Sequence, residues 1–132
     1  MRSVIFVMVS VSLGLFAKAG PNCATRSVAF SLPNSASQAC RGSKLTGTHT
    51  LKLCDNKKGS MKMSGREYFL YADKNLWKFR EEQTNSSSGT LNIEALSIDF
   101  GNKSFNYTNE KKKEDGTVLK STVCDGVLEM RN

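Results

Sequence analysis

Histidine is almost missing from this chain, because His49 is the only one in 132 residues. A single histidine excludes an acid–base pair of two histidines and a histidine-rich metal site. The sequence also has no Cys-x-x-Cys pair, which argues against a structural zinc site. It contains no nucleophile elbow, no phosphate-binding glycine loop and no paired-carboxylate motif. These absences are more typical of a binding protein than of an enzyme.

Long apolar runs are also lacking, except for SVIFVMVSVSLGLF near the N-terminus. This run follows Arg2, precedes an Ala-x-Ala site, and is shorter than the roughly 18–20 residues that cross a bilayer. It therefore predicts a secretory signal peptide over residues 1–19. Cys23 follows Pro21 and Asn22 rather than the small residues of the cleavage site, which argues against a lipid anchor. We expect a secreted or periplasmic protein that does not span a membrane once the signal is removed.

Four cysteines follow the predicted signal: Cys23, Cys40, Cys54 and Cys124. An even number of cysteines in an exported chain predicts two disulfides. Three connectivities are possible for four cysteines. We favour Cys23–Cys40, which closes a local loop, with Cys54–Cys124 joining an early strand to the last one. The longer loop would stabilise a small domain by restricting its unfolded chain.

Acidic residues are scarce in one part of the chain. Arg2 and Lys18 leave with the predicted signal, so 17 basic and 12 acidic residues remain and the net charge becomes +5. Residues 41–80 hold ten basic and three acidic side chains, whereas residues 81–132 hold six and nine. This separation favours an anionic partner, either a protein, a glycan or a lipid headgroup, although a solvated basic face is the commoner meaning. No nucleic acid is expected as a partner.

A helical stripe of apolar residues does not occur after the predicted signal. Residues 20–43 read as a loop segment with one short strand, SVAFSL, over residues 27–32. From residue 44 onward, alternating runs such as KLTGTHTLKLC are separated by turn residues. We predict an all-β, antiparallel meander of about seven to nine short strands over residues 44–132. Together with residues 20–43 it should form a single disulfide-stapled domain, either a small barrel or a two-layer sandwich.

Turn residues predict how the later strands pair. A two-residue turn at residues 101–102 pairs Leu96 with Tyr107. A second turn, at residues 115–116, sets Tyr107 opposite Cys124. These pairings place all three residues on one face, which suits a buried disulfide at Cys124.

Aromatic residues are few after the predicted signal, and five of the nine lie in residues 66–81, REYFLYADKNLWKFRE. A three-residue hairpin loop, Asp-Lys-Asn, pairs Phe69 with Phe79 and Tyr71 with Trp77. All four rings then share one face, whereas a shift of one residue would divide the aromatics between two faces. We therefore predict that most of these rings belong to the core.

The opposite face of this hairpin then carries the candidate ligand-binding residues Arg66, Tyr68, Lys78 and Arg80. Cations beside an aromatic ring on a rigid sheet can hold an anionic group. An ordinary solvated strand face is the alternative.

Other residue patterns give weaker indications. Met61 and Met63 share a strand face and could offer thioethers to copper, but methionines at such positions more often fill a core, so no metal or cofactor is expected. His49 with Glu67 or Glu81 could transfer protons. Glycosylation sequons occur at Asn85, Asn102 and Asn106, and they matter only in a eukaryotic source.

These observations favour a small secreted or periplasmic binding protein that recognises an anionic partner. One alternative is a small secreted, nuclease-like hydrolase that uses His49. A structural component of the cell envelope is the other.

Overall fold

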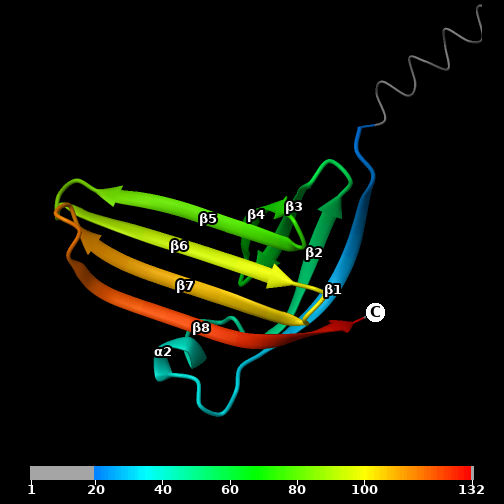
Figure 1. Cartoon of the computed structure of the whole chain (residues 1–132), viewed down its shortest axis with the longest axis horizontal. Helices are drawn as coiled ribbons and strands as arrows, with labels where there is room; N and C mark the ends of the chain where they lie inside the picture. The colour runs from blue at the N-terminus through cyan, green and yellow to red at the C-terminus, as the bar shows by residue number, and fades with distance from the viewer. Residues whose placement is uncertain (1–19, 132) are drawn as a thin grey trace, which may run out of the picture.

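The computed structural model describes residues 20–131, which form a closed barrel of eight antiparallel strands (Figure 1). The elements are β1 (Cys23–Ser31), α2 (Gln38–Arg41), β2 (Gly47–Cys54), β3 (Lys58–Met63), β4 (Arg66–Asp73), β5 (Leu76–Asn85), β6 (Thr90–Asp99), β7 (Ser104–Lys113) and β8 (Val118–Arg131). The predicted all-β meander is confirmed, and the barrel is formed rather than the sandwich. The predicted signal peptide lies outside the described residues.

The N-terminal strand closes the barrel. β1 pairs with β2 and with β8, so that Phe30 lies beside Gly47 on one side and Leu128 on the other. β1 starts four residues before the predicted strand over residues 27–32, because residues 23–26 also pair with the end of β2. α2 is a single turn that the alternation did not predict, and the Cys40 N–H donates to Ser37 Oγ at its start.

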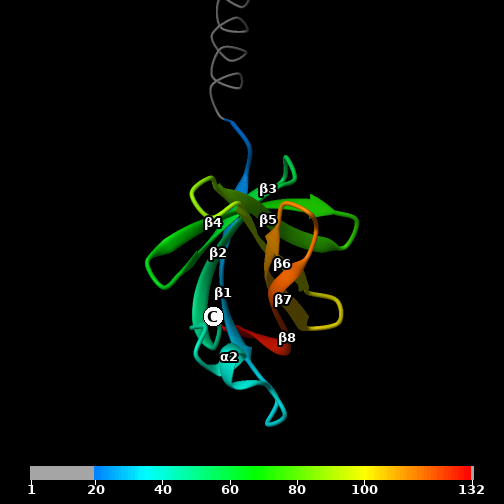
Figure 2. The ribbon, with the colours of Figure 1, turned by 90° about the vertical axis from the view of Figure 1, so that its left-hand side faces the viewer.

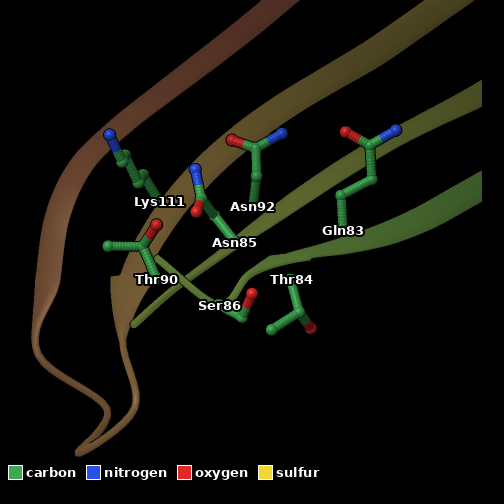
Figure 3. A pocket seen from close by; sticks show the side chains of 7 residues that line it. All are labelled: Gln83, Thr84, Asn85, Ser86, Thr90, Asn92 and Lys111. Atoms are coloured by element: carbon green, nitrogen blue, oxygen red, sulfur yellow. The ribbon is translucent and has the colours of Figure 1, made fainter. Parts of the chain in front are cut away.

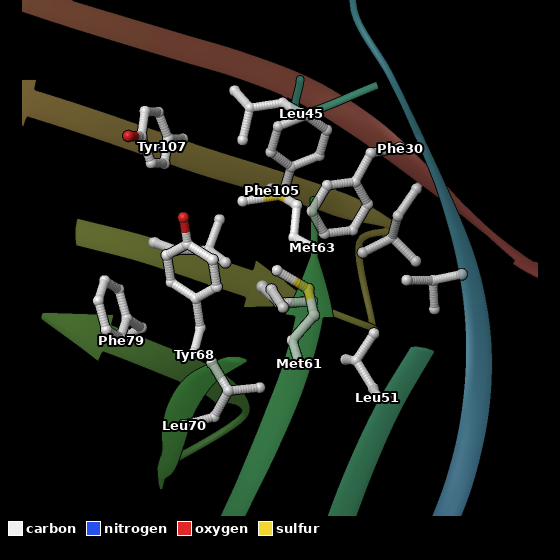
Figure 4. Close-up of a cluster of buried hydrophobic side chains, with 14 of the residues drawn as sticks. Phe30, Leu45, Leu51, Met61, Met63, Tyr68, Leu70, Phe79, Phe105 and Tyr107 are labelled. Atoms are coloured by element: carbon white, nitrogen blue, oxygen red, sulfur yellow. The ribbon is translucent and has the colours of Figure 1, made fainter. Parts of the chain in front are cut away.

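Alternate residues of the strands fill the barrel interior (Figure 4). Leu51, Met61 and Ile98 are completely buried, and the ring of Phe30 stacks on Phe105 with centroids 4.2 Å apart. Eight strands enclose a space just wide enough for side chains to fill. The centre of the barrel is therefore a packed core, and the hollows of the molecule lie toward its two ends.

The predicted disulfide connectivity is wrong. Cys23 is bonded to Cys54, and Cys40 to Cys124. The register of β1 on β2 places Cys23 directly opposite Cys54, whereas Cys40 lies nine residues beyond the end of β1, in α2. Cys124 is inward and buried, as predicted, and it is the partner of α2.

The predicted register of the β4–β5 hairpin is also wrong. Tyr71 pairs with Lys78 and Ala72 with Trp77, so the turn has two residues rather than three, and Lys74 takes a φ of +59°. This shift of one residue turns β4 over. Phe69 and Tyr71 are 70% and 46% exposed, contrary to the expectation that they are core residues.

The side chains that β4 buries in their place are Tyr68 and Leu70. On β5, Phe79 is buried as expected, and Trp77 is half-buried on the same inner face.

The two later hairpins pair as predicted, up to a register shift between Lys111 and Lys112 near the last turn. Leu96 is opposite Tyr107, and Tyr107 is opposite Cys124. β5 to β8 contain 10 to 14 residues, whereas β2 to β4 contain six to eight, so the β5–β8 sheet extends beyond the rest of the barrel (Figure 1). Among residues 20–131, no helix has the length and apolar character needed to cross a membrane.

Candidate functional site

The inner face of the β5–β8 sheet changes from apolar to polar along its strands. Cross-strand pairing aligns the inward side chains in rows, with one residue from each strand. The row at the edge of the core contains Phe79, Leu96, Tyr107 and Cys124. The next row contains Glu81, Glu94, Asn109 and Thr122. The row beyond it contains Gln83, Asn92, Lys111 and Lys120.

This polar floor is hollowed in two adjoining places. One hollow, of about 510 Å³, lies over the tips of β5 and β6, where Gln83, Asn92 and Lys111 project to the same side of the sheet (Figure 3). The other, of about 540 Å³, lies between the sheet and the segment that contains α2. Both are lined by Asn92 and Lys111, so the two hollows adjoin, and we treat them together. We call the pair the polar cleft and define it by Gln83, Asn92, Asn109, Lys111, Lys120 and Thr122.

The second wall of the polar cleft comes from α2 and the residues that follow it. Ala39, Gly42 and Ser43 line the cleft opposite the sheet. The Cys40–Cys124 disulfide fixes this segment to the inner face of β8. α2 lies beside β8 in the ribbon view (Figure 2). The disulfide therefore holds the two walls of the cleft together.

An arginine organises the base of the polar cleft. Arg66 donates to Glu81 Oε2 at 2.7 Å through Nη2 and to Glu94 Oε1 at 3.0 Å through Nη1. Its guanidinium also lies over the ring of Tyr68, 4.5 Å from the centroid. Glu81 and Glu94 are directly opposite each other across β5 and β6, and like charges in this position repel. Arg66 relieves that repulsion by bonding to both.

Two buried phenols adjoin this ion-pair network. Tyr107 donates its hydroxyl hydrogen to Glu94 Oε2 at 2.6 Å. Burial, followed by this hydrogen bond, raises the pKa of Tyr107 to about 12. Burial, assisted by the negative charge of Glu94, also raises the pKa of Tyr68. Both phenols therefore keep their protons at neutral pH, and Tyr107 remains a hydrogen-bond donor.

The polar cleft contains two lysines on adjacent strands. Lys111 and Lys120 are directly opposite each other on β7 and β8, and neither forms an ion pair within residues 20–131. Lys112, one residue further along β7, bonds to Glu110 at 3.0 Å. Two cations in a directly opposed pair repel each other. An anion bound between them would relieve this repulsion.

The structure does not bring the four predicted site residues together. Arg66 and Tyr68 lie at the base of the polar cleft. Lys78 and Arg80 lie on the outer face of β5 and bond to Asp73 at 2.9 Å and Glu82 at 3.2 Å, respectively. The division follows from the corrected hairpin register, because the face of β4 predicted to be outer is in fact inner.

The residues of the polar cleft were not identified from the sequence, although a signal for them exists. The predicted pairing of Leu96 with Tyr107 also pairs Asn92 with Lys111 when it is extended toward the strand tips. The pairing of Tyr107 with Cys124 places Lys120 opposite Lys111 in the same way. The register therefore predicts a polar inner row, but one of the two hollows above it depends on the segment that contains α2.

The other sequence candidates lie inside the barrel. His49 is buried, donates from Nε2 to the carbonyl oxygen of Leu45 at 2.5 Å, and meets the ring of Phe30 edge-on. This environment is that of a structural histidine and gives a proton-transfer role no support. Met61 and Met63 are buried in the core. Residues 20–131 contain no cluster of three His, Cys, Asp or Glu side chains placed to hold a metal ion.

No protein-family model, curated protein or solved structure matches this chain. Its function is therefore inferred from its own residues. Those residues combine amide, hydroxyl and ammonium groups on the floor of a wide, open cleft. Such groups bind a polar ligand through hydrogen bonds and charge.

Proposed function

We propose that this protein is a secreted or periplasmic binding protein whose polar cleft holds an acidic oligosaccharide. Lys111 and Lys120, which form no ion pair within residues 20–131 and lie among amide side chains, are the observation that carries this proposal. An amide both donates and accepts hydrogen bonds, which matches the hydroxyl groups of a sugar. A lysine supplies the charge that a carboxylate or sulfate group on the sugar requires.

The shape of the cleft supports a chain-like ligand rather than a compact one. The two hollows, of about 510 and 540 Å³, adjoin along the row that contains Asn92 and Lys111. Both are open to solvent. Successive sugar units can therefore lie across the strands and present their hydroxyls to Gln83, Asn92 and Asn109 in turn.

The carboxylates at the base of the cleft support binding rather than hydrolysis. Glycoside hydrolysis uses two carboxyl groups, one of which donates a proton to the departing oxygen. Here Arg66 donates to both Glu81 and Glu94, and Tyr107 donates to the second oxygen of Glu94. These oxygens act as acceptors, so neither carboxyl group is arranged as a proton donor.

Two further features support an extracellular or periplasmic location. The two disulfides are typical of oxidising compartments, and the N-terminal pattern predicts export. Acidic polysaccharides are accessible to a protein in those compartments.

Calorimetric titration of the oxidised protein with hexagalacturonate and with neutral maltohexaose tests this function. We expect the acidic sugar to bind, with an affinity that falls as salt rises, because charges are screened over about 8–10 Å at physiological ionic strength. The double variant Lys111→Gln/Lys120→Gln should weaken binding about tenfold or more, since charge-assisted hydrogen bonds are lost.

The matched control is Lys58→Gln/Lys62→Gln, which removes the same charge from exposed positions on the outer face of β3. It should leave binding nearly unchanged. Equal losses in the two double variants would show non-specific charge attraction. Equal affinity for the acidic and the neutral sugar would also contradict the proposal.

Lys78 and Arg80, which the sequence predicts as ligand-binding residues for an anionic partner, belong to a second candidate surface. Phe69 and Tyr71 are exposed on the outer face of β4, and Lys78 is the direct neighbour of Tyr71. Exposed aromatic rings beside cations fit an acidic protein partner. Charge reversal by Lys78→Glu/Arg80→Glu should abolish such binding and spare the binding of hexagalacturonate, whereas loss of both would contradict a separate protein-binding surface.

A further inference from the structure

Another hollow, separate from the two that make up the polar cleft, opens at the other end of the barrel. It has a volume of about 380 Å³ and is lined by Arg26, Leu53, Trp77, Phe100 and Met130. Along β5, Trp77 precedes the buried Phe79, whereas the polar cleft begins after it. We call this hollow the Trp77 cleft. Four of its five lining side chains are apolar, unlike those of the polar cleft.

The backbone of β3 packs closely against the indole of Trp77 at Gly59, which has no side chain. A Cβ atom at Gly59 of β3 would lie 3.3 Å from Trp77 Cζ3, 3.2 Å from Leu53 Cδ2 and 2.5 Å from the carbonyl oxygen of Lys52. Only glycine therefore lets β3 pass this close to the ring. Trp77 is held against the core while one side of it stays accessible. The wall of the Trp77 cleft is thus a rigid aromatic surface.

The core beneath the Trp77 cleft limits how far a ligand can enter. Val28, Leu51 and Ile98 are completely buried in the adjoining layer of the barrel. A ligand must therefore lie in the mouth of the barrel rather than inside it. A volume of about 380 Å³ is near the lower end of the roughly 300–1,000 Å³ of small-molecule sites, so a short apolar chain fits.

The rim of the Trp77 cleft carries one arginine, Arg26. Within residues 20–131, Arg66, Arg80 and Arg131 each form an ion pair with a glutamate, and Arg41 donates hydrogen bonds to backbone carbonyls. Arg26 alone has no such partner in that part of the chain. An apolar cleft with one available guanidinium is complementary to an apolar molecule that ends in an anion.

We propose that the Trp77 cleft binds a medium-chain fatty carboxylate, with its hydrocarbon chain against Trp77 and Phe100 and its carboxylate on Arg26. This site is separate from the polar cleft and does not depend on the function proposed for it. Burial of the chain supplies affinity, because it removes apolar surface from water. The guanidinium supplies selectivity for an anionic end group through a bidentate hydrogen bond.

Trp77 is the only tryptophan in the chain, so tryptophan fluorescence reports on the surroundings of this one residue. The probes are octanoate, octan-1-ol and octyltrimethylammonium, each below the concentration at which it forms micelles. Octanoate should give a saturable shift of emission to shorter wavelength, because the chain covers the exposed side of the indole. Octan-1-ol should bind about tenfold more weakly or worse, and the cation should be weaker still.

Arg26→Gln should lower the affinity for octanoate to that for octan-1-ol. Arg131→Gln is the matched control, because Arg131 is an exposed arginine near the same end of the barrel that pairs with Glu129 at 3.8 Å and does not line the Trp77 cleft. It should bind octanoate normally, as should Lys111→Gln/Lys120→Gln, which separates this site from the polar cleft. Thermal unfolding of each variant verifies its fold.

Three outcomes would overturn the proposal. One is the absence of a saturable fluorescence change with octanoate in the native protein. Another is equal affinity for octanoate and octyltrimethylammonium. The third is an unchanged affinity for octanoate in a folded Arg26→Gln variant.

Discussion

The rings of Tyr68 and Phe79 meet edge to face inside the barrel, with their centroids 4.8 Å apart and their planes at 81°. They come from β4 and β5, which pair over only three positions, from Asp73 opposite Leu76 to Tyr71 opposite Lys78. Beyond those positions, side chains rather than backbone hydrogen bonds join the two strands. The aromatic contact and the ion pair of Arg66 with Glu81 both bridge this seam. The polar cleft begins beside it.

The orientation of β4 predicts a sharp contrast between two neighbouring phenylalanines. Phe79→Ala should destabilise the protein by about 3–5 kcal/mol, as truncation of a buried phenylalanine does. Phe69→Ala should change stability by at most about 0.5 kcal/mol, because this side chain is 70% exposed. Urea denaturation followed by circular dichroism measures both. A large loss from Phe69→Ala would support the three-residue turn instead.

The two disulfides should contribute unequally to stability. The Cys40–Cys124 bond spans 84 residues and the Cys23–Cys54 bond spans 31. The loop-entropy relation then predicts losses of about 4.6 and 3.7 kcal/mol for paired replacement by serine. Denaturant unfolding of Cys40→Ser/Cys124→Ser and Cys23→Ser/Cys54→Ser makes the comparison.

Only the first replacement should also impair the polar cleft, because Cys40 fixes α2 at its wall. Peptide mapping of the oxidised protein provides the control for connectivity. A cross-linked peptide containing Cys23 and Cys40 would contradict this structure.

Stability should fall in alkaline solution as the buried phenols ionise. The folded protein raises the pKa of Tyr107 from 10.0 to about 12, so the folded state holds this proton more tightly than the unfolded chain does. The resulting stabilisation is complete below pH 10 and is lost as the pH rises through 12. Because one pKa unit corresponds to about 1.4 kcal/mol, the loss is at most about 2 kcal/mol after allowance for solvent screening.

Urea denaturation between pH 8 and pH 12 measures this dependence, and absorbance of tyrosinate follows the ionisation directly. Tyr107→Phe should flatten the stability curve over the same range. Tyr68 also has a raised pKa, so a smaller slope of the same sign should remain in that variant. A rise in stability with pH would contradict the assignment.

Gly126 of β8 should tolerate no side chain. An added Cβ would lie 2.5 Å from Phe105 Cε1 and would also press on the carbonyl oxygen of Ser31. Gly126→Ala should therefore cost about 1–3 kcal/mol through overpacking. Gly42→Ala is the control, because its Cβ would be in ordinary contact, 3.5 Å from the carbonyl oxygen of Gln38. Comparable melting temperatures for the two variants would show that the Phe105 ring can move aside.

Sequence alone determined the fold class and most of the later pairing. Alternation between inward and outward residues is a local property of each strand, and turn residues such as Asp115–Gly116 bring consecutive strands together without reference to the rest of the chain. These signals placed Leu96 opposite Tyr107 and set Tyr107 opposite Cys124. The presence of two disulfides likewise followed from an even number of cysteines in a chain with an export pattern.

Tertiary structure alone decided the orientation of β4, the partners of the cysteines and both clefts. Apolar residues occupy both faces of β4, so its alternation could not show whether Phe69 or Tyr68 points inward, and closure of the barrel settled the choice. Cys40 meets Cys124 because α2 packs on β8. The polar cleft and the Trp77 cleft are built from side chains on four or more separate segments. Such sites form only when strands that are distant in the sequence come together. Local sequence patterns do not predict which strands those are.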